Sequence, residues 1–129
     1  MAREKKEPVI VMSFAFYVPG DYSFEKFEKK SLDYCLFDSP IEIWGTPENV
    51  IAGITVHNEI IREVAAGSDQ VRFVDQNGLI PKNGLYFNDI CHLTEKGCER
   101  FVDNLTGIIL ETMGVKNSAG RFTALYRNN

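Results

Sequence analysis

The sequence lacks the features that assign a chain to a membrane, nucleic-acid-binding or disulfide-stapled class. No run of about 18 apolar residues occurs, so we expect no membrane span. Fourteen Lys and Arg stand against eighteen Asp and Glu, and the net charge of -4 without a basic patch argues against a nucleic-acid partner. Three cysteines without framework spacing argue against a disulfide-stapled secreted domain.

The chain is also short, and its first residues do not resemble a signal peptide. Its 129 residues suffice for one small domain, and a hydrophobic content of 44% suffices for a core. Residues 1–7 are mostly charged and have no apolar stretch behind a basic start, so we do not interpret them as a signal peptide. No repeat is present, and the sequence indicates no particular compartment.

Two segments have the composition of buried parallel strands. Residues 8–18 form a nearly continuous apolar run that ends at Pro19-Gly20, and residues 71–75 form a shorter one. Continuous rather than alternating runs are typical of strands covered on both faces. A strand as apolar as the first normally has a neighbour on each side, and only one is visible. The sequence therefore predicts a parallel pair, joined by a right-handed crossover, that lacks sheet partners.

Helices are predicted on either side of the second strand. Thr46-Pro47 is a typical helix start and Gly67 a typical stop. Thr94 opens the last helix, in which apolar residues recur at steps of three and four until Gly114.

The remaining segments carry weaker patterns. Residues 22–32 predict a short exposed helix, and residues 33–45 are irregular. Residues 76–84, with two Asn-Gly pairs around a proline, predict a loop with defined turns.

The segment with the clearest chemical content holds Asp89 and His92, three residues apart and just before the last predicted helix. In a tight turn this spacing lets both side chains face the same way. The carboxylate then fixes the imidazole tautomer and leaves Nε2 free to take a proton, as a general base must. On spacing alone, however, an aspartate that caps a turn beside a hydrogen-bonded histidine is the favoured interpretation.

The residues around Asp89 and His92 favour the catalytic interpretation over the structural one. The stretch Phe87-x-Asp89-x-x-His92-Leu93-Thr94-x-x-Gly97 resembles the last conserved block of SGNH (GDSL-type) hydrolases. The similarity extends back through His57-Asn58 to the strand at residues 9–19, and it covers about residues 8–113 in all.

This resemblance implies an α/β fold, a partial three-layer α/β/α (flavodoxin-like SGNH hydrolase) architecture that lacks its N-terminal strands. The implied organisation is a charged segment at residues 1–7, the C-terminal part of the hydrolase-like domain at 8–114 and a polar tail at 115–129.

The resemblance also implies a site for ester hydrolysis without a cofactor. His92 would be the general base and Asp89 its orienter, acting on a small-molecule ester such as an acyl or acetyl ester. The family's nucleophile is the Ser of a Gly-Asp-Ser block, and a Gly and an Asn complete its oxyanion hole. None of these blocks is present. The stretch Gly20-Asp21-Tyr22-Ser23 has an extra residue and follows the wrong strand, and Ser13 is expected to be structural.

Three hypotheses remain open. The chain is a piece of a serine esterase, completed by a missing N-terminal half or by a partner subunit, and inactive in isolation. Alternatively, it is a non-catalytic docking module that binds through the edge of its first strand, or a decayed remnant.

Other polar residues have simpler interpretations. Cys91, His92, Cys98 and His57 have no standard metal-ligand spacing, so we expect no metal site. Cys91 is a poor nucleophile candidate because the side chains of adjacent residues, here Cys91 and His92, tend to point apart. Cys98 is expected to be a small buried side chain.

Three further expectations concern packing. Asn58 is expected to be a buried group that ties its helix to a loop, and His57 to lie at the helix surface or core edge. Trp44, with Phe16 and Tyr17, is expected to pack in the core rather than to line a cleft.

Overall fold

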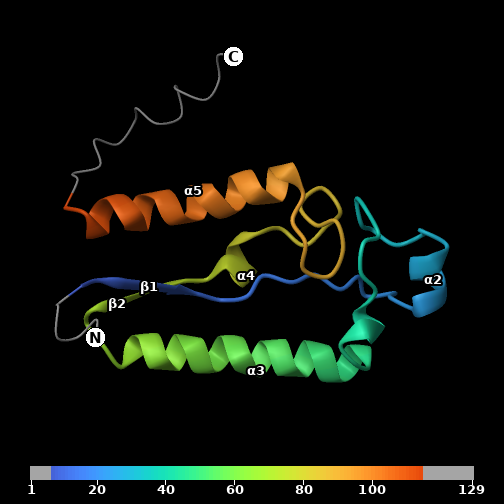
Figure 1. The fold of residues 1–129 in the computed structure, drawn as a ribbon, viewed down its shortest axis with the longest axis horizontal. Coiled ribbons are helices and arrows are strands. Elements are labelled where there is room, and N and C mark those ends of the chain that lie inside the picture. The colour runs from blue at the N-terminus through green and yellow to red at the C-terminus, as the bar shows by residue number, and fades with distance from the viewer. Residues whose placement is uncertain (1–6, 115–129) are drawn as a thin grey trace, which may run out of the picture.

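The computed structural model describes residues 7–114, which form a small mixed α/β unit. The predicted segments 1–7 and 115–129 lie outside the described residues, apart from Glu7. Figure 1 shows the two-stranded sheet between two long helices, with α3 against one face and α5 against the other. The elements in chain order are β1 (Val9–Met12), α2 (Phe24–Glu28), the 3-10 helix η1 (Ile41–Ile43), α3 (Pro47–Ala66), β2 (Val71–Val74), α4 (Gln76–Leu79) and α5 (Glu95–Thr112).

The predicted parallel pair is confirmed, and with it the α/β class. β1 and β2 run parallel, with Val9 opposite Val71 and Met12 opposite Val74. β1 is much shorter than the predicted strand at residues 8–18. It ends at Met12 because β2 offers only four residues to pair with, and the Phe14 and Phe16 amides beyond it bond to side chains instead.

Asn58 of α3 provides the first of these side-chain bonds. Its Oδ1 accepts from Phe14 N at 2.7 Å and its Nδ2 donates to Phe14 O at 3.0 Å, so one amide takes the place of a neighbouring strand. The expectation that Asn58 is a buried tie is therefore confirmed. The helix has the predicted bounds, and Thr46 is its N-cap residue, although the Thr46 side chain makes no capping hydrogen bond.

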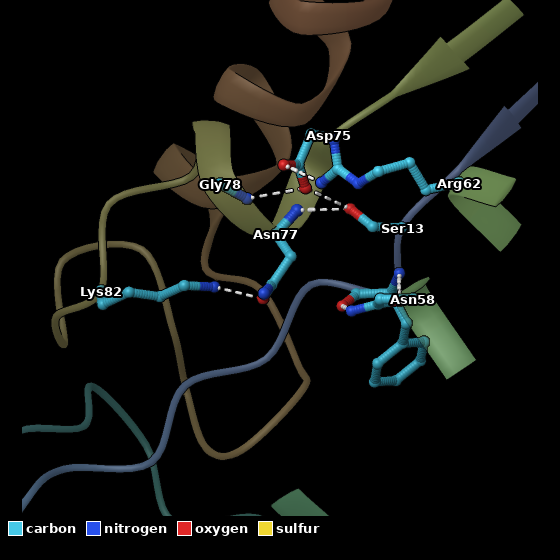
Figure 2. A network of polar contacts seen from close by, with 8 residues as sticks. Ser13, Asn58, Arg62, Asp75, Asn77, Gly78 and Lys82 are labelled. Atoms are coloured by element: carbon cyan, nitrogen blue, oxygen red, sulfur yellow. Dashed lines mark hydrogen bonds and ion pairs between the residues drawn. The ribbon is translucent and has the colours of Figure 1, made fainter. Parts of the chain in front are cut away.

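A second set of side-chain bonds joins the carboxyl ends of both strands (Figure 2). Ser13 Oγ donates to Asp75 Oδ1 and accepts from Asn77 N, each at 2.8 Å. Arg62 Nη2 of α3 donates to Asp75 Oδ2 at 2.7 Å. Ser13 is thus structural, as predicted.

The prediction of a loop throughout residues 76–84 is wrong at its start. Residues Gln76–Leu79 form one helical turn, α4, because the Asp75 carboxylate accepts from Gly78 N and caps it. Further on, Lys82 Nζ donates to Phe16 O at 2.6 Å and to Asn77 Oδ1 at 2.7 Å, which ties the loop to the segment after β1.

α5 begins as predicted and buries less of its apolar stripe than expected. Thr94 Oγ1 accepts from Gly97 N at 3.0 Å, and the helix runs to Thr112 before Gly114, whose φ is 69°. Phe101 is partly buried, whereas Cys98 is exposed. The prediction that Cys98 is buried is wrong because the stripe is wider than the contact with the sheet.

The most buried cluster lies beyond the carboxyl ends of the strands, under α2 and the loops (Figure 1). Aromatic rings meet edge to face there, as in the pair Phe27 and Phe37, whose centroids are 5.3 Å apart. The cluster contains Phe27, Leu32, Tyr34, Ile80 and Phe87. Among the described helices, none combines the length and apolar character needed to cross a membrane.

We expect Asn58→Ala to lower the free energy of unfolding by about 1–3 kcal/mol, because it leaves the N–H and C=O of Phe14 without their partner. Urea denaturation followed by circular dichroism measures this. Glu59→Ala, at the exposed next position, is the matched control and should change it by less than about 0.5 kcal/mol. Equal stability of the two variants would contradict the role given to Asn58.

Candidate active site

The predicted site residues lie in a closed loop just before α5. Phe87 and Leu93 form an antiparallel bridge across the loop, and Asn88 N donates to His92 O at 2.8 Å. Thr94 N donates to Tyr86 O at 3.1 Å where the loop closes. The loop therefore has a defined shape of its own.

Two other segments hold this loop from either side. Tyr17 N, beyond β1, donates to Ile90 O at 2.8 Å. Cys35 N donates to Phe87 O at 3.0 Å and Leu36 N to Asn88 O at 3.1 Å. The loop is thus fixed at the carboxyl end of the sheet, where ligand sites of parallel sheets lie.

The carboxylate of Asp89 is fully buried and accepts several hydrogen bonds. Its Oδ1 accepts from Cys91 N at 3.0 Å and from His92 N at 2.8 Å. Its Oδ2 accepts from Ser39 N at 3.0 Å. These hydrogen bonds compensate the removal of the carboxylate from water.

His92 completes the arrangement. Its Nδ1 lies 2.7 Å from Asp89 Oδ2, and 54% of its side chain is exposed. A carboxylate partner requires Nδ1 to carry the proton, so Nε2 of the neutral ring is the acceptor. The hydrogen bond to Asp89, and then its negative charge, raise the pKa of His92 above 6.5. The structure brings the two predicted residues together in the geometry of a general base and its orienter.

Gly97 explains why a glycine follows the loop at this position. A Cβ on Gly97 would overlap the carbonyl oxygen of Tyr86 and press on Leu93. The first turn of α5 therefore packs directly on the backbone of the loop, and Thr94 Oγ1 adds a bond to Leu85 O at 2.6 Å. This close approach fixes the helix relative to His92.

Two cavities lie beside the loop, and Cys91 and His57 line both. The larger, of about 460 Å³, is mostly apolar. Trp44, half exposed at its edge, lines this cleft, so the prediction that it packs in the core is wrong, whereas Tyr17 does pack against the core cluster. The smaller cavity measures about 330 Å³ and is lined by Met12, Ser13, Phe14, Ala15, His57, Cys91, Leu93 and Phe101.

His92 lines neither cavity, but its neighbour Cys91 lines both. Burial, and then the charge of Asp89, raise the pKa of the Cys91 thiol to about 11, so it is protonated and weakly nucleophilic near neutral pH. Ser23, in the stretch that resembles a Gly-Asp-Ser block, caps α2 through a bond from Lys26 N. Within residues 7–114, Asp89 is the sole side chain hydrogen-bonded to His92.

A metal ion is the other ligand that this cluster could hold. Donor atoms of Asp89, Cys91 and His92 lie within 4.8 Å of one another. However, Nδ1 of His92 and both Asp89 oxygens already share hydrogen bonds, and the thiol is not poised to ionise. Cys98 and His57 of the set considered from the sequence are not part of this group. The arrangement suits proton transfer better than metal binding.

Two participants in the site had no signal in the sequence. Ser39 acts through its backbone N–H, which any residue other than proline would supply. Phe14 lines both cavities because the chain leaves β1 there, and the apolar run alone could not distinguish this from continued pairing.

Comparison of the chain with family models, with curated proteins and with solved structures finds no match.

We expect Gly97→Ala to lower the free energy of unfolding by about 1–3 kcal/mol, because the added methyl group must displace backbone. Gly107→Ala is the matched control in the same helix, where a Cβ meets nothing within 4 Å. It should raise the free energy of unfolding by about 0.5–1 kcal/mol. Thermal or urea unfolding of both variants checks the pair, and stabilisation by both would contradict the close packing.

We expect the ring of His92 to titrate above pH 6.5, which NMR of its ring protons can follow. Asp89→Asn should lower the pKa of His92. Because the folded-state pKa is raised, the pair stabilises the fold fully below about pH 6.5, and this contribution is lost as pH rises through the folded-state pKa. Asp38→Asn is the control, since Asp38 raises the pKa of His92 least among the causes that raise it. If Asp38→Asn lowered the pKa of His92 more than Asp89→Asn did, the role of Asp89 as the main cause of the raised pKa would be contradicted.

Proposed function

We propose that this chain carries the base and orienter of an SGNH-type serine ester hydrolase that acts on small-molecule acyl esters. The observation that carries the proposal is the bond between His92 Nδ1 and the fully buried Asp89 Oδ2, at 2.7 Å. The opposite ring nitrogen is left as an acceptor on a half-exposed ring. The resemblance of residues 87–97 to the last SGNH block supports the same assignment.

In the proposed reaction, a serine hydroxyl from a segment outside residues 7–114 attacks the ester carbonyl carbon. His92 Nε2 takes the hydroxyl proton, and the Asp89 carboxylate stabilises the imidazolium that forms. The C–O bond to the alcohol then breaks, and His92 returns the proton to the leaving oxygen. Water, deprotonated by the same nitrogen, hydrolyses the acyl-enzyme and restores the serine.

The larger cavity supports a small acyl group as the part of the substrate nearest to this loop. Its volume of about 460 Å³ lies within the range of small-molecule sites, about 300–1,000 Å³. Phe14, Trp44 and Ile54 give it an apolar wall, which suits a short hydrocarbon chain better than a charged group.

The test uses the full reading frame that contains residues 1–129, cloned from the source DNA with the in-frame sequence upstream of the Met1 codon. With p-nitrophenyl acetate as substrate, His92→Ala should lower kcat/KM at least about 10⁴-fold and Asp89→Asn about 10²–10⁴-fold. Residues 1–129 alone should hydrolyse it no faster than their own His92→Ala variant.

His57→Ala is the matched control, because His57 lines the cavities without contacting Asp89 and should change kcat/KM only a few-fold. Activity should rise with pH through the raised pKa of His92, since only the neutral ring accepts a proton. Hydrolysis that persists in His92→Ala would sink the proposal, as would an upstream sequence without a serine that a fluorophosphonate labels.

A further inference from the structure

β1 has one edge that pairs with no other strand of residues 7–114. Ser13 N donates to Val74 O, so the backbone groups of Ser13 point toward β2. Successive residues of a strand point their backbone groups to opposite edges, and therefore those of Ile10 and Met12 point away from β2. All four residues of β1 are apolar and only partly buried, although a helix lies against each face of the sheet. The partial burial agrees with an open edge.

The helix α3 presents an apolar stripe beside this edge. His57 lines the smaller cavity together with Met12, near the carboxyl end of β1. Ile61 and Val64 follow His57 at steps of four and three, so they continue that side of the helix toward the amino end of β1. Val64 is 65% exposed. Arg62, which instead stacks on an aromatic ring of β2, lies about 160° around the helix from Val64.

The helix α5 presents a second stripe on the other face of the sheet. Phe101 lines the smaller cavity, and Leu105 and Ile109 follow it at steps of four. Leu105 is half-buried and Ile109 is exposed. Asn104, on the side of β2, bonds to Gln76. Two apolar stripes thus flank the open edge, and both run from the smaller cavity toward the amino end of β1.

The open edge can accept only a short strand. The next residue of the alternation after Met12 is Phe14, whose N–H and C=O are bonded to the Asn58 amide. An added strand can therefore pair alongside Ile10 and Met12, and at Phe14 it meets a backbone that is already satisfied. This length suits a strand of about four to six residues.

The order of the elements determines where a parallel strand after α5 would lie. α3 lies against one face of the sheet and α5 against the other (Figure 1). Crossovers between parallel strands are right-handed in about 98% of cases, so crossovers over opposite faces lead in opposite directions across the sheet. α3 leads from β1 to β2. A parallel strand that follows α5 is therefore led back past β1, to its open edge.

The sequence after α5 contains a segment with the composition of a short strand. Residues 121–126 read Arg-Phe-Thr-Ala-Leu-Tyr, within the otherwise polar residues 115–129. Phe, Thr and Tyr are enriched in strands. Alternate side chains of an added strand would face α3 and α5 in turn, and both helices offer an apolar stripe there. The segment therefore suits an edge that is flanked by apolar side chains on both faces.

The connection to this segment is long enough. α5 ends at the amino end of β1, which is where a parallel strand must begin (Figure 1). Residues 115–120 can span about 20 Å when extended, at about 3.3–3.6 Å per residue. They end in Asn117-Ser118-Ala119-Gly120, which is rich in turn-forming residues.

We propose that residues 121–126 add to the open edge of β1 as a third parallel strand, which makes β1 the central strand and covers the stripes on α3 and α5. Unpaired N–H and C=O groups select a polypeptide strand over a lipid or a small apolar ligand. A segment tethered to α5 has an effective concentration of about a millimolar, which favours it over a second copy of the chain.

The inference does not rest on the proposed function. Ser118 precedes the added strand and lies at the amino end of the sheet, so this strand does not supply the serine of the proposed reaction. A parallel strand leads residues 127–129 toward the smaller cavity, which is lined by Cys91, the neighbour of His92. The added strand thus closes the side of the sheet next to that loop.

The test is amide hydrogen exchange of residues 1–129, measured by NMR. The amides of Ile10 and Met12 should be protected, and Leu125→Asp should speed their exchange at least about tenfold. The Ser13 amide, which is bonded to Val74 O, should keep its exchange rate and serves as the internal reference. Asn128→Asp introduces the same charge beyond the strand and should change neither.

A matched pair of variants on α3 tests the stripe. Val64→Glu should speed the exchange of Ile10 and Met12 as Leu125→Asp does. Val56→Glu should not, because Val56, although exposed, is two residues from the buried Asn58 and so points away from the sheet. An equal effect of the two variants would contradict the proposed surface.

Nuclear Overhauser contacts between residues 121–126 and β1 provide a measurement that needs no variant. In a mixture of isotope-labelled and unlabelled chains, these contacts should arise within one chain. Contacts between chains would overturn the proposal in favour of a second copy, and the absence of contacts would reject the strand. Unprotected Ile10 and Met12 amides would overturn it as well, as would protection that persists in Leu125→Asp. If Leu125→Asp also exposes Ser13 by unfolding the chain, the contacts in the unaltered chain decide.

Discussion

The buried carboxylate of Asp89 is the constraint on which the site depends. A carboxylate out of contact with water costs several kcal/mol unless hydrogen bonds replace its hydration. The chain supplies them from three backbone amides and one imidazole. Two of these amides follow Asp89 within three residues and one comes from Ser39, so the turn and the preceding loop must close around the same group. The position of His92 is a consequence of that closure.

Hydrogen bonds to otherwise unpaired polar groups also determine how the short sheet ends. Each strand has only four residues, and beyond β1 the amides of Phe14 and Phe16 bond to side chains instead of a ladder. Asn58 bonds both polar groups of Phe14, while Ser13 and Asp75 join the two strand ends to α4 and α3. Partial burial raises the pKa of Asp75, but the bonds from Arg62 and Ser13 outweigh it and lower the pKa overall, which keeps this junction charged and bonded.

Local sequence signals predicted those parts of the fold that local physics determines. Thr94 and Gly114 bound α5 because capping and helix termination depend on nearby backbone, and the parallel pair followed from apolar runs. The three-residue spacing of Asp89 and His92 likewise predicted that they face each other. Their role in catalysis stays a prediction.

The missed features depend on contacts between distant residues. The apolar run at residues 8–18 does not reveal that pairing stops at Met12, because this depends on the four-residue length of β2 and on the Asn58 bonds to Phe14, both far along the chain. The turn at Gln76–Leu79 is helical because Asp75 caps it while Ser13, from the other strand, bonds Asn77 N. The exposure of Cys98 could not be predicted either, since periodicity defines a stripe but not how much of it a neighbour covers.

The hydrogen-bonded pair of His92 and Asp89 forms within residues 7–114 alone. Every bond to the Asp89 carboxylate comes from residues 39–92, and the loop is held by Tyr17, Cys35 and Leu36. In the proposed reaction the substrate would therefore meet an imidazole that is already oriented, so binding energy need not be spent on positioning it. The proposed reaction also needs a hydroxyl group and donors for the oxyanion, whereas within residues 7–114 Asp89 is the one side chain hydrogen-bonded to His92.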